Sequence, residues 1–143
     1  MTDLLSRLRS RSWRLSPQRR VVAEVLVGEH VHLTAEQVHA LAGDRLPEIS
    51  RATVYNTLNE LVAMGELLEV AVVDGPKRYD PNVGTAHDHL VCESCHQILD
   101  VPPARPRPAV PADERAGYLV TGVEVIHRGL CPACTARHRT TPD

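Results

Sequence analysis

The 143-residue chain contains no phenylalanine, one tryptophan and three tyrosines, so its hydrophobic core must be built mainly from aliphatic side chains. No apolar run approaches the roughly 20 residues that a membrane-spanning helix needs, and the N-terminus shows no apolar signal-peptide region. These absences predict a cytoplasmic protein of one large domain or two small ones, without a membrane partner.

Cysteine is also scarce, and all four residues fall in two Cys-x-x-Cys pairs, Cys92 with Cys95 and Cys131 with Cys134. Together the pairs supply four thiolates, the ligand set of a closed, tetrahedral zinc site. Either pair alone would suit a redox dithiol, and two disulfides would suit a secreted chain. We favour structural zinc, because that interpretation uses every cysteine in one site.

The net charge of -2 conceals a basic N-terminal end. Residues 1–20 carry one acid, Asp3, and six arginines: Arg7, Arg9, Arg11, Arg14, Arg19 and Arg20. Such a cluster is either an ordinary solvated face or a surface that contacts nucleic-acid phosphates.

The pattern of the N-terminal half predicts short helices followed by a two-stranded hairpin. Signals for helix starts and ends stand at Ser16-Pro17, Thr34–Gln37, Ser50 and Gly65. The helix after Thr34 is expected to bury Val38 and Leu41. Strands are expected over 67–73 and 77–79, joined by the turn sequence Asp74-Gly75.

Short helices followed by a hairpin are typical of a winged-helix DNA-binding domain. The helix before the hairpin would lie in the major groove, with its polar side chains Arg51, Tyr55 and Asn56 toward the DNA. The basic hairpin, which carries Lys77, would contact phosphate. A plain helical bundle with a polar surface is the alternative.

The C-terminal half predicts a small sheet held together by zinc. Strands are expected over 97–101 and 118–127, and residues 112–116 could make one helical turn. The proline-rich segment Pro102–Pro111 excludes a regular helix or a central strand. Because the sheet is small for an independent monomer, an exposed edge would suit dimerisation by strand addition.

Two histidines next to the first cysteine pair, His87 and His89, are spaced to face one way on a strand, which favours a pair of metal ligands. On pattern alone His32 is an ordinary surface histidine, Asp80 before Pro81 belongs to a turn, and Asp100 is a solvated strand end. The histidines expected to bind no metal are His30, His39, His96, His127 and His138.

Several sequence elements resemble the ferric uptake regulator family. They are Ser16-Pro17-Gln18-Arg19, Ala52-Thr53-Val54-Tyr55-Asn56-Thr57-Leu58, Arg78-Tyr79-Asp80, His87-Asp88-His89-Leu90-Val91-Cys92-x-x-Cys95 and Cys131-x-x-Cys134. These elements keep the family's order and spread over nearly the whole chain. The resemblance implies a dimeric, metal-dependent, winged-helix transcriptional repressor that is not an enzyme.

The resemblance also implies an α+β fold in two domains. A winged-helix DNA-binding domain would span residues 1–80, and a small α/β dimerisation and metal-binding domain with the four-cysteine zinc site would span residues 81–143. The hinge between them is expected at about residues 80–86. The expected partners are double-stranded operator DNA and a second copy of the chain.

A second, regulatory metal site is implied by the same resemblance. Its ligands would be His32, Asp80, His87, His89 and Asp100. Nitrogen and oxygen donors of this kind suit iron(II) or manganese(II) better than zinc. Metal that draws the first two ligands toward the other three would fix the angle between the DNA-binding domains of a dimer.

Aspartate at both carboxylate positions, and Asn56 after Tyr55, resemble the peroxide-sensing branch of the family. In that branch bound iron(II) reacts with hydrogen peroxide, oxygen adds to a ligating histidine, and DNA is released. Here the oxidised residues would be His32 and His87. The alternatives within the family are an iron-responsive repressor without peroxide chemistry and a sensor of manganese, zinc or nickel.

The expected DNA contacts divide into groove and phosphate contacts. They are Arg14 in or near the minor groove, Tyr55 against a thymine methyl group, Asn56 toward a base or phosphate, and Arg19, Arg51 and Lys77 on phosphates.

The chain departs from the family at three places. The linker from Asp80 to His87 is one residue longer than in peroxide sensors, and Pro102–Pro111 replaces a helix between two strands. Val123 stands where a further family metal site uses a histidine, so that additional site is expected to be absent or weak.

Two other classes of protein fit the sequence less well. A zinc hydrolase would need an open metal position and a general base, but Glu93 lies between two cysteines and no His-Glu-x-x-His is present. A zinc-ribbon interaction module would leave the helix-and-hairpin half unexplained.

Overall fold

The computed structural model describes residues 3–28, 30–72 and 74–140. It divides the chain into two compact units, unit 1 up to Thr85 and unit 2 from Ala86. The division falls inside the segment 80–86 expected to form the hinge. Within the described residues, none of the helices combines the length and the apolar character needed to cross a membrane.

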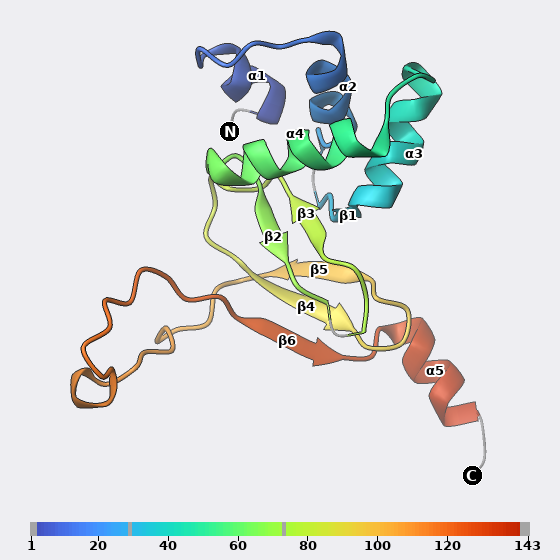
Figure 1. Ribbon diagram of the computed structural model, residues 1–143. Coiled ribbons are helices and arrows are strands. Elements are labelled where there is room, and N and C mark those ends of the chain that lie inside the picture. Colours follow the sequence, from blue (N-terminus) through green and yellow to red (C-terminus); the bar gives the residue numbers. More distant parts are fainter. Residues whose placement is uncertain (1–2, 29, 73, 141–143) are drawn as a thin grey trace. The chain divides into compact units, whose positions relative to one another are not determined.

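Unit 1 combines four helices with a small sheet (Figure 1). Its elements are α1 (Leu4–Arg9), α2 (Pro17–Val25), β1 (Leu33–Thr34), α3 (Ala35–Arg45), α4 (Arg51–Ala63), β2 (Leu68–Val70) and β3 (Arg78–Asp80). Strands β2 and β3 form the predicted antiparallel hairpin, and β1 pairs with the other side of β3. This is the predicted winged-helix arrangement, with the addition of β1, whose two residues are too few to give a sequence pattern.

Side-chain caps explain where the helices of unit 1 begin. The side chains of Ser16 and Ser50 each accept a hydrogen bond from the backbone N–H three residues ahead. Thr34 and Gln37 form the complete capping box predicted for α3. Gly65 follows α4 with φ +75°, a left-handed conformation that glycine adopts without steric penalty.

The core of unit 1 is aliphatic, as the scarcity of aromatic residues predicts. Its fully buried side chains include Leu4, Leu8, Val22, Leu26, Val38, Val54, Leu58, Leu61 and the single buried aromatic Tyr79. In α3 the buried stripe is Ala35, Val38 and Ala42. Leu41, predicted to point inward, is 45 % exposed because it lies at the edge of that stripe.

A buried carboxylate ties α1 to the segment after α4. One oxygen of Glu66 accepts a hydrogen bond from Arg7 Nε at 2.7 Å, and the other accepts from Arg11 Nη1 at 2.8 Å. Burial by itself raises the pKa of Glu66, but the two guanidinium groups outweigh it and hold the pKa below its ordinary value of 4.5. The ionised carboxylate therefore stabilises the folded unit.

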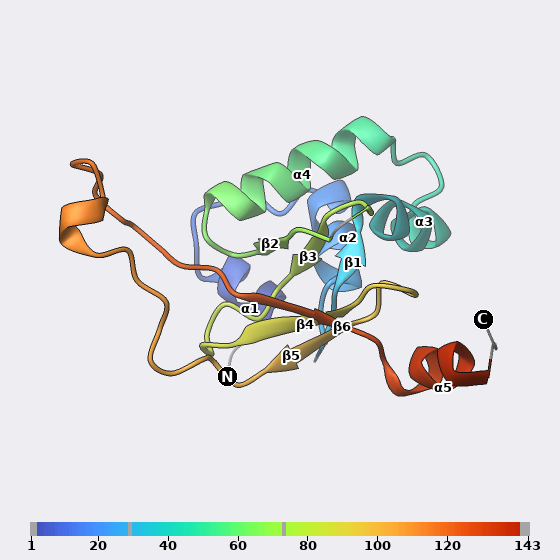
Figure 2. The ribbon, with the colours of Figure 1, turned by 90° about the horizontal axis from the view of Figure 1, so that it is seen from below.

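Unit 2 is built on a three-stranded sheet (Figure 2). Its elements are β4 (Asp88–Cys92), β5 (Ile98–Val101), the 3-10 helix η1 (Ala112–Glu114), β6 (Ile126–Gly129) and α5 (Pro132–Thr140). Strand β4 is central, with β5 antiparallel on one side and β6 parallel on the other. Residues 102–125 loop away from this sheet, and Pro102–Pro111 forms no regular helix or strand, as predicted.

The strand predicted over 118–127 is wrong for most of its length. Only Ile126 and His127 belong to β6, whereas Tyr118 and Leu119 are 79 % and 88 % exposed. A strand needs a hydrogen-bonded neighbour, and the pairing of β6 with β4 begins at Ile126. Helix α5 was not predicted, because its sequence is polar on all sides and carries no apolar period.

Replacing Glu66 by Gln is expected to lower the free energy of unfolding at pH 7 by about 2 kcal/mol, because charge-assisted hydrogen bonds to two arginines are weakened. The pKa of Glu66 is lower in the folded state than in the unfolded state. The contribution of the Glu66 carboxylate to the free energy of unfolding is therefore present above pH 4.5 and is lost as the pH falls through the folded-state pKa. Urea unfolding of both proteins between pH 7 and pH 3 should show the difference shrinking in acid; a constant difference would contradict the role of the charge.

Candidate functional site: metal centres and nucleic-acid interface

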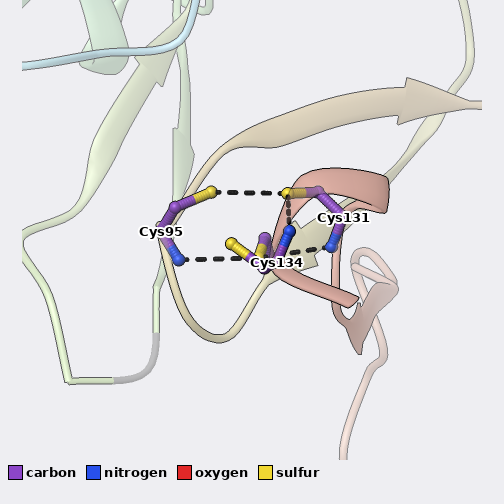
Figure 3. A group of neighbouring side chains, drawn as sticks. Cys95, Cys131 and Cys134 are labelled. Carbon is purple, nitrogen blue, oxygen red and sulfur yellow. Dashed lines mark hydrogen bonds between the residues drawn. The ribbon is translucent and has the colours of Figure 1, made fainter. Parts of the chain in front are cut away.

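Two turns bring the four cysteines of unit 2 together. Cys92 ends β4 and Cys95 lies in the following turn, whereas Cys131 follows β6 and Cys134 lies in the first turn of α5. All four sulfur atoms lie within 4.8 Å of one another, and Cys95 Sγ is 3.8 Å from Cys131 Sγ (Figure 3). The cysteines form no disulfide, so the cluster is consistent with the predicted four-thiolate zinc site.

Hydrogen bonds favour the thiolate form of two of these cysteines. The backbone N–H groups of Cys95 and Cys131 donate to Cys92 Sγ at 3.5 and 3.3 Å and lower the pKa of Cys92 to about 6. Side-chain hydrogen bonds with Ser94, Cys131 and Arg137 lower the pKa of Cys134, and the guanidinium nitrogen of Arg137 donates to Cys134 Sγ at 2.9 Å. Thiolate is the form that binds metal, so Cys92 and Cys134 favour the metal-binding form. At Cys95 a hydrogen bond from the Gln97 backbone is outweighed by those with the other cysteines, which raise its pKa to about 11.

A second donor group in unit 2 contains nitrogen and oxygen. The register of β4 and β5 pairs His89 with Asp100, and His87 stands two residues before His89. The Nε2 atoms of His87 and His89 lie 3.6 and 3.4 Å from Asp100 Oδ1, and the two rings meet edge to face with centroids 4.7 Å apart. Three predicted ligands of the regulatory site are thus neighbours within this unit.

The remaining two predicted ligands are neighbours within unit 1. Strand β1 pairs with β3 so that Leu33 faces Tyr79, and one step further along this register His32 comes beside Asp80. His32 Nε2 lies 3.3 Å from Asp80 Oδ2. The sheet therefore brings together two residues that on sequence pattern alone were a surface histidine and a turn residue.

The donor spacing in both groups suits a cation. Two ligands in an octahedral site with bonds of ~2.1 Å stand ~3 Å apart, close to the separations of 3.3 to 3.6 Å observed here. Imidazole and carboxylate donors suit iron(II) or manganese(II), so the residues present fit the metals that the resemblance implies. One histidine expected to bind no metal, His39, has its Nε2 3.1 Å from the carbonyl of Ile49.

The side chains predicted to contact DNA lie in unit 1 and differ in what they contact. Tyr55 and Asn56 are exposed on α4, and Arg14 is exposed in the segment between α1 and α2. Arg51 is 3.2 Å from Glu36, but both side chains are more than half exposed, so this ion pair is weak.

Lys77 contacts its own hairpin. Its Nζ lies 2.8 Å from Glu69 Oε1 and 5.8 Å from the centre of the Tyr79 ring. The hydrogen bond with Glu69 raises the pKa of Lys77 and so favours its charged form.

Arg19 is bound within the fold. Its guanidinium lies 4.4 Å from the centre of the Trp13 ring and 2.8 Å from Glu60 Oε2. The Trp13 indole N–H donates to the same carboxylate oxygen at 3.0 Å, and Arg19 Nη1 donates to the Arg14 carbonyl at 2.9 Å. Arg19 thus fastens the segment carrying Arg14 to α4, a role that the sequence pattern did not indicate.

Asp88 lies between the two histidines in sequence, yet it contacts the proline-rich segment. Its carboxylate accepts hydrogen bonds from the Ala104 N–H at 2.7 Å and from Arg107 Nη1 at 2.8 and 2.9 Å. Arg107 Nη2 also donates to the carbonyl of Val123 at 3.4 Å. That the additional metal site near Val123 is absent or weak stays a prediction. The positively charged guanidinium of Arg107 beside the Val123 carbonyl supports this prediction.

Comparison with known proteins decides the family. Residues 10–105 match the ferric uptake regulator family. The chain belongs to this family. It is 35% identical over 134 residues to the transcriptional regulator FurA of Mycobacterium tuberculosis, covering 93% of this chain and 90% of FurA. It is 30% identical over 139 residues to the peroxide-responsive repressor PerR of Staphylococcus epidermidis, covering 94% and 89%.

Solved structures of a peroxide stress regulator and of a ferric uptake regulator share the fold. The chain matches the Campylobacter jejuni peroxide stress regulator with a TM-score of 0.64 and 26% identity, covering 93% of this chain and 100% of that one. It matches the Helicobacter pylori ferric uptake regulator with a TM-score of 0.69 and 22% identity, covering 92% and 91%. The predicted family and the α+β fold are confirmed.

Family membership settles the broad function of the chain. Members of the ferric uptake regulator family are transcriptional regulators rather than enzymes, so the hydrolase interpretation is excluded. The chain is a metal-responsive transcriptional regulator.

Replacing Cys95 by Ser is expected to reduce the metal bound at the four-cysteine cluster from one ion per chain to a small fraction, because a hydroxyl group is a poor ligand for a soft site. Elemental analysis after gel filtration measures this. Glu93→Ala is the matched control, since Glu93 is exposed in the same turn and is not among the clustered residues. Full metal content in C95S would contradict four-sulfur ligation.

Proposed function

We propose that this regulator is a homodimeric repressor that binds operator DNA in its metal-loaded form and releases it on exposure to hydrogen peroxide. The observation that carries the proposal is the presence, in each unit, of an aspartate beside histidine: Asp80 with His32, and Asp100 with His87 and His89. Aspartate at both positions resembles the peroxide-sensing branch.

In this proposal zinc occupies the four-cysteine cluster in a structural role. Unit 2 has few buried apolar side chains, and among the described residues these are Val91, Cys92 and Cys134. Because this core is small, metal binding would supply part of the folding free energy of unit 2, as it does in small zinc domains.

The regulatory metal in this proposal is iron(II) or manganese(II). One ion would take His32 and Asp80 from unit 1 and His87, His89 and Asp100 from unit 2. Because its ligands come from both units, the ion would bind only one arrangement of the units tightly and so would favour it. That arrangement is proposed to be the one that binds DNA.

Bound iron(II) would catalyse the reaction of hydrogen peroxide with a ligating histidine, whose ring would supply the two electrons. The net change is that a histidine ring gains one oxygen atom and one molecule of water is released. His32 and His87 are the proposed targets, one from each unit. An oxidised imidazole is a poorer ligand, so the units would separate and DNA would be released. The similarity to PerR supports this proposal.

The second candidate is an iron-responsive repressor without peroxide chemistry. The chain is 35% identical to the transcriptional regulator FurA and 30% identical to PerR, so the peroxide-responsive relative is the less similar of these two. Both candidates use the same metal ligands, and they differ only in what the bound iron does with peroxide.

The proposed homodimer would form through unit 2. Strand β6 is an edge of its sheet, and exposed apolar side chains precede it at Tyr118, Leu119 and Val120. A second copy could pair with this edge and cover these side chains.

Replacing Arg14 by Ala is expected to weaken binding to the operator duplex and to reduce the slope of log affinity against log salt concentration by about 0.9, the effect of one lost phosphate contact. Fluorescence anisotropy at several salt concentrations measures both. Arg45→Ala is the control, because it also removes one arginine but is not among the predicted DNA contacts. Arg45 is the last residue of α3 and pairs with Glu24 at 3.0 Å. An unchanged slope in R14A would contradict both a minor-groove and a phosphate contact.

Iron(II)-loaded protein given a brief, low dose of hydrogen peroxide is expected to gain one oxygen atom on the peptides that carry His32 or His87. Peptide mass spectrometry measures the gain, and manganese-loaded protein is the control that should stay unmodified. Unmodified histidines in protein whose DNA binding still requires iron would overturn peroxide sensing and favour the iron-responsive repressor.

A further inference from the structure

One arginine of α1 reaches the backbone beside a proposed metal ligand. Arg7 donates from Nε to Glu66 Oε2 at 2.7 Å and from Nη2 to the carbonyl of Pro81 at 3.1 Å. A longer contact of 3.4 Å joins Nη2 to the Glu66 carbonyl. Pro81 directly follows Asp80, so this side chain connects the first helix to the turn that begins at Asp80.

That turn is built from the Asp80 carboxylate and the Pro81 carbonyl. Asp80 Oδ1 accepts a hydrogen bond from the Asn82 N–H at 2.8 Å, and the Pro81 carbonyl accepts from the Val83 N–H at 3.0 Å. Because Oδ1 is engaged by the backbone, the carboxylate is oriented with Oδ2 toward His32, 3.3 Å away. The direction of the ligand oxygen therefore depends on the shape of the turn.

A second arginine provides a natural comparison. Arg11 donates to the other oxygen of Glu66 at 2.8 Å and to the carbonyl of Met64 at 3.0 Å. Both arginines thus pair with the same buried carboxylate, and each also donates to backbone carbonyls, those of Pro81 and Glu66 for Arg7 and that of Met64 for Arg11. They differ in which carbonyl they hold: Arg11 holds the end of α4, and Arg7 holds the turn after Asp80.

We propose that Arg7 is a positioning residue for the regulatory metal site, holding the turn 80–83 in the shape that directs Asp80 Oδ2 toward the ion. This inference rests on the proposed role of Asp80 as a metal ligand. Groups that orient metal ligands by hydrogen bonding contribute to metal affinity although they never touch the metal. Without Arg7 the turn would have to be ordered when metal binds, which opposes binding.

The test compares Arg7→Ala with Arg11→Ala in zinc-loaded, full-length protein. Each variant loses one ion pair to Glu66, so the two should lose similar stability in urea unfolding. Titration calorimetry with manganese(II) is expected to show affinity about 10-fold lower for R7A and essentially unchanged for R11A. Arg7→Lys, which keeps the charge near Glu66 but cannot span both acceptors, should fold normally and still show weakened binding.

A second measurement needs no regulatory metal. In the protein without regulatory metal, hydrogen exchange of the Asn82 and Val83 amides should be faster in R7A and R7K than in wild type, and unchanged in R11A. Equal manganese affinity and equal exchange at these amides in R7A and R11A would overturn the inference.

Asp80→Ala separates this inference from the proposed function. If D80A leaves manganese affinity unchanged, Asp80 is not a ligand, and both the regulatory site and the inference fail. If D80A abolishes binding while R7A and R11A behave alike, the site stands and only the role of Arg7 is overturned.

Discussion

Four sulfur atoms held within 4.8 Å of one another are the constraint on which unit 2 depends. They join two segments, at Cys95 and Cys131, that stand 36 residues apart. Much of the chain between them, residues 102–125, forms no strand and contributes no buried side chain. Four thiolates at such separations would repel one another without a cation between them, so the arrangement is consistent with a metal site. The few buried apolar side chains of the unit could not replace it.

Unit 1 is stabilised by different means. Helix caps, an aliphatic core and the Glu66 carboxylate between two arginines hold its helices against the small sheet. The arginines of the basic N-terminal end accordingly have different roles. Arg7, Arg11 and Arg19 are bound to carboxylates inside the unit, whereas Arg9, Arg14 and Arg20 are exposed. A cluster of like charges in the sequence therefore resolves into three structural cations and three exposed ones that are available to phosphates.

Several features of the fold and the site could not be predicted from the sequence for physical reasons. The apolar, β-branched run at 118–125 has the composition of a strand, but pairing requires a neighbour that the pattern does not reveal. The ion pair of Arg107 with Asp88 and the contacts of Arg19 with Trp13 and Glu60 join residues that lie apart in the chain. Spacing along the chain carries no information about such pairs.

The sequence by itself determined the helix starts at Ser16, Thr34 and Ser50, the hairpin, the two cysteine pairs and the family, because caps, turns and metal-ligand spacings are local properties of a few neighbouring residues. Only the tertiary structure decided how distant groups meet: the separations among the four sulfurs, the strand pairing that brings His32 to Asp80, and the contact of Arg7 with the carbonyl of Pro81. These contacts depend on strand register and helix packing, which the whole chain sets together, so no single segment encodes them.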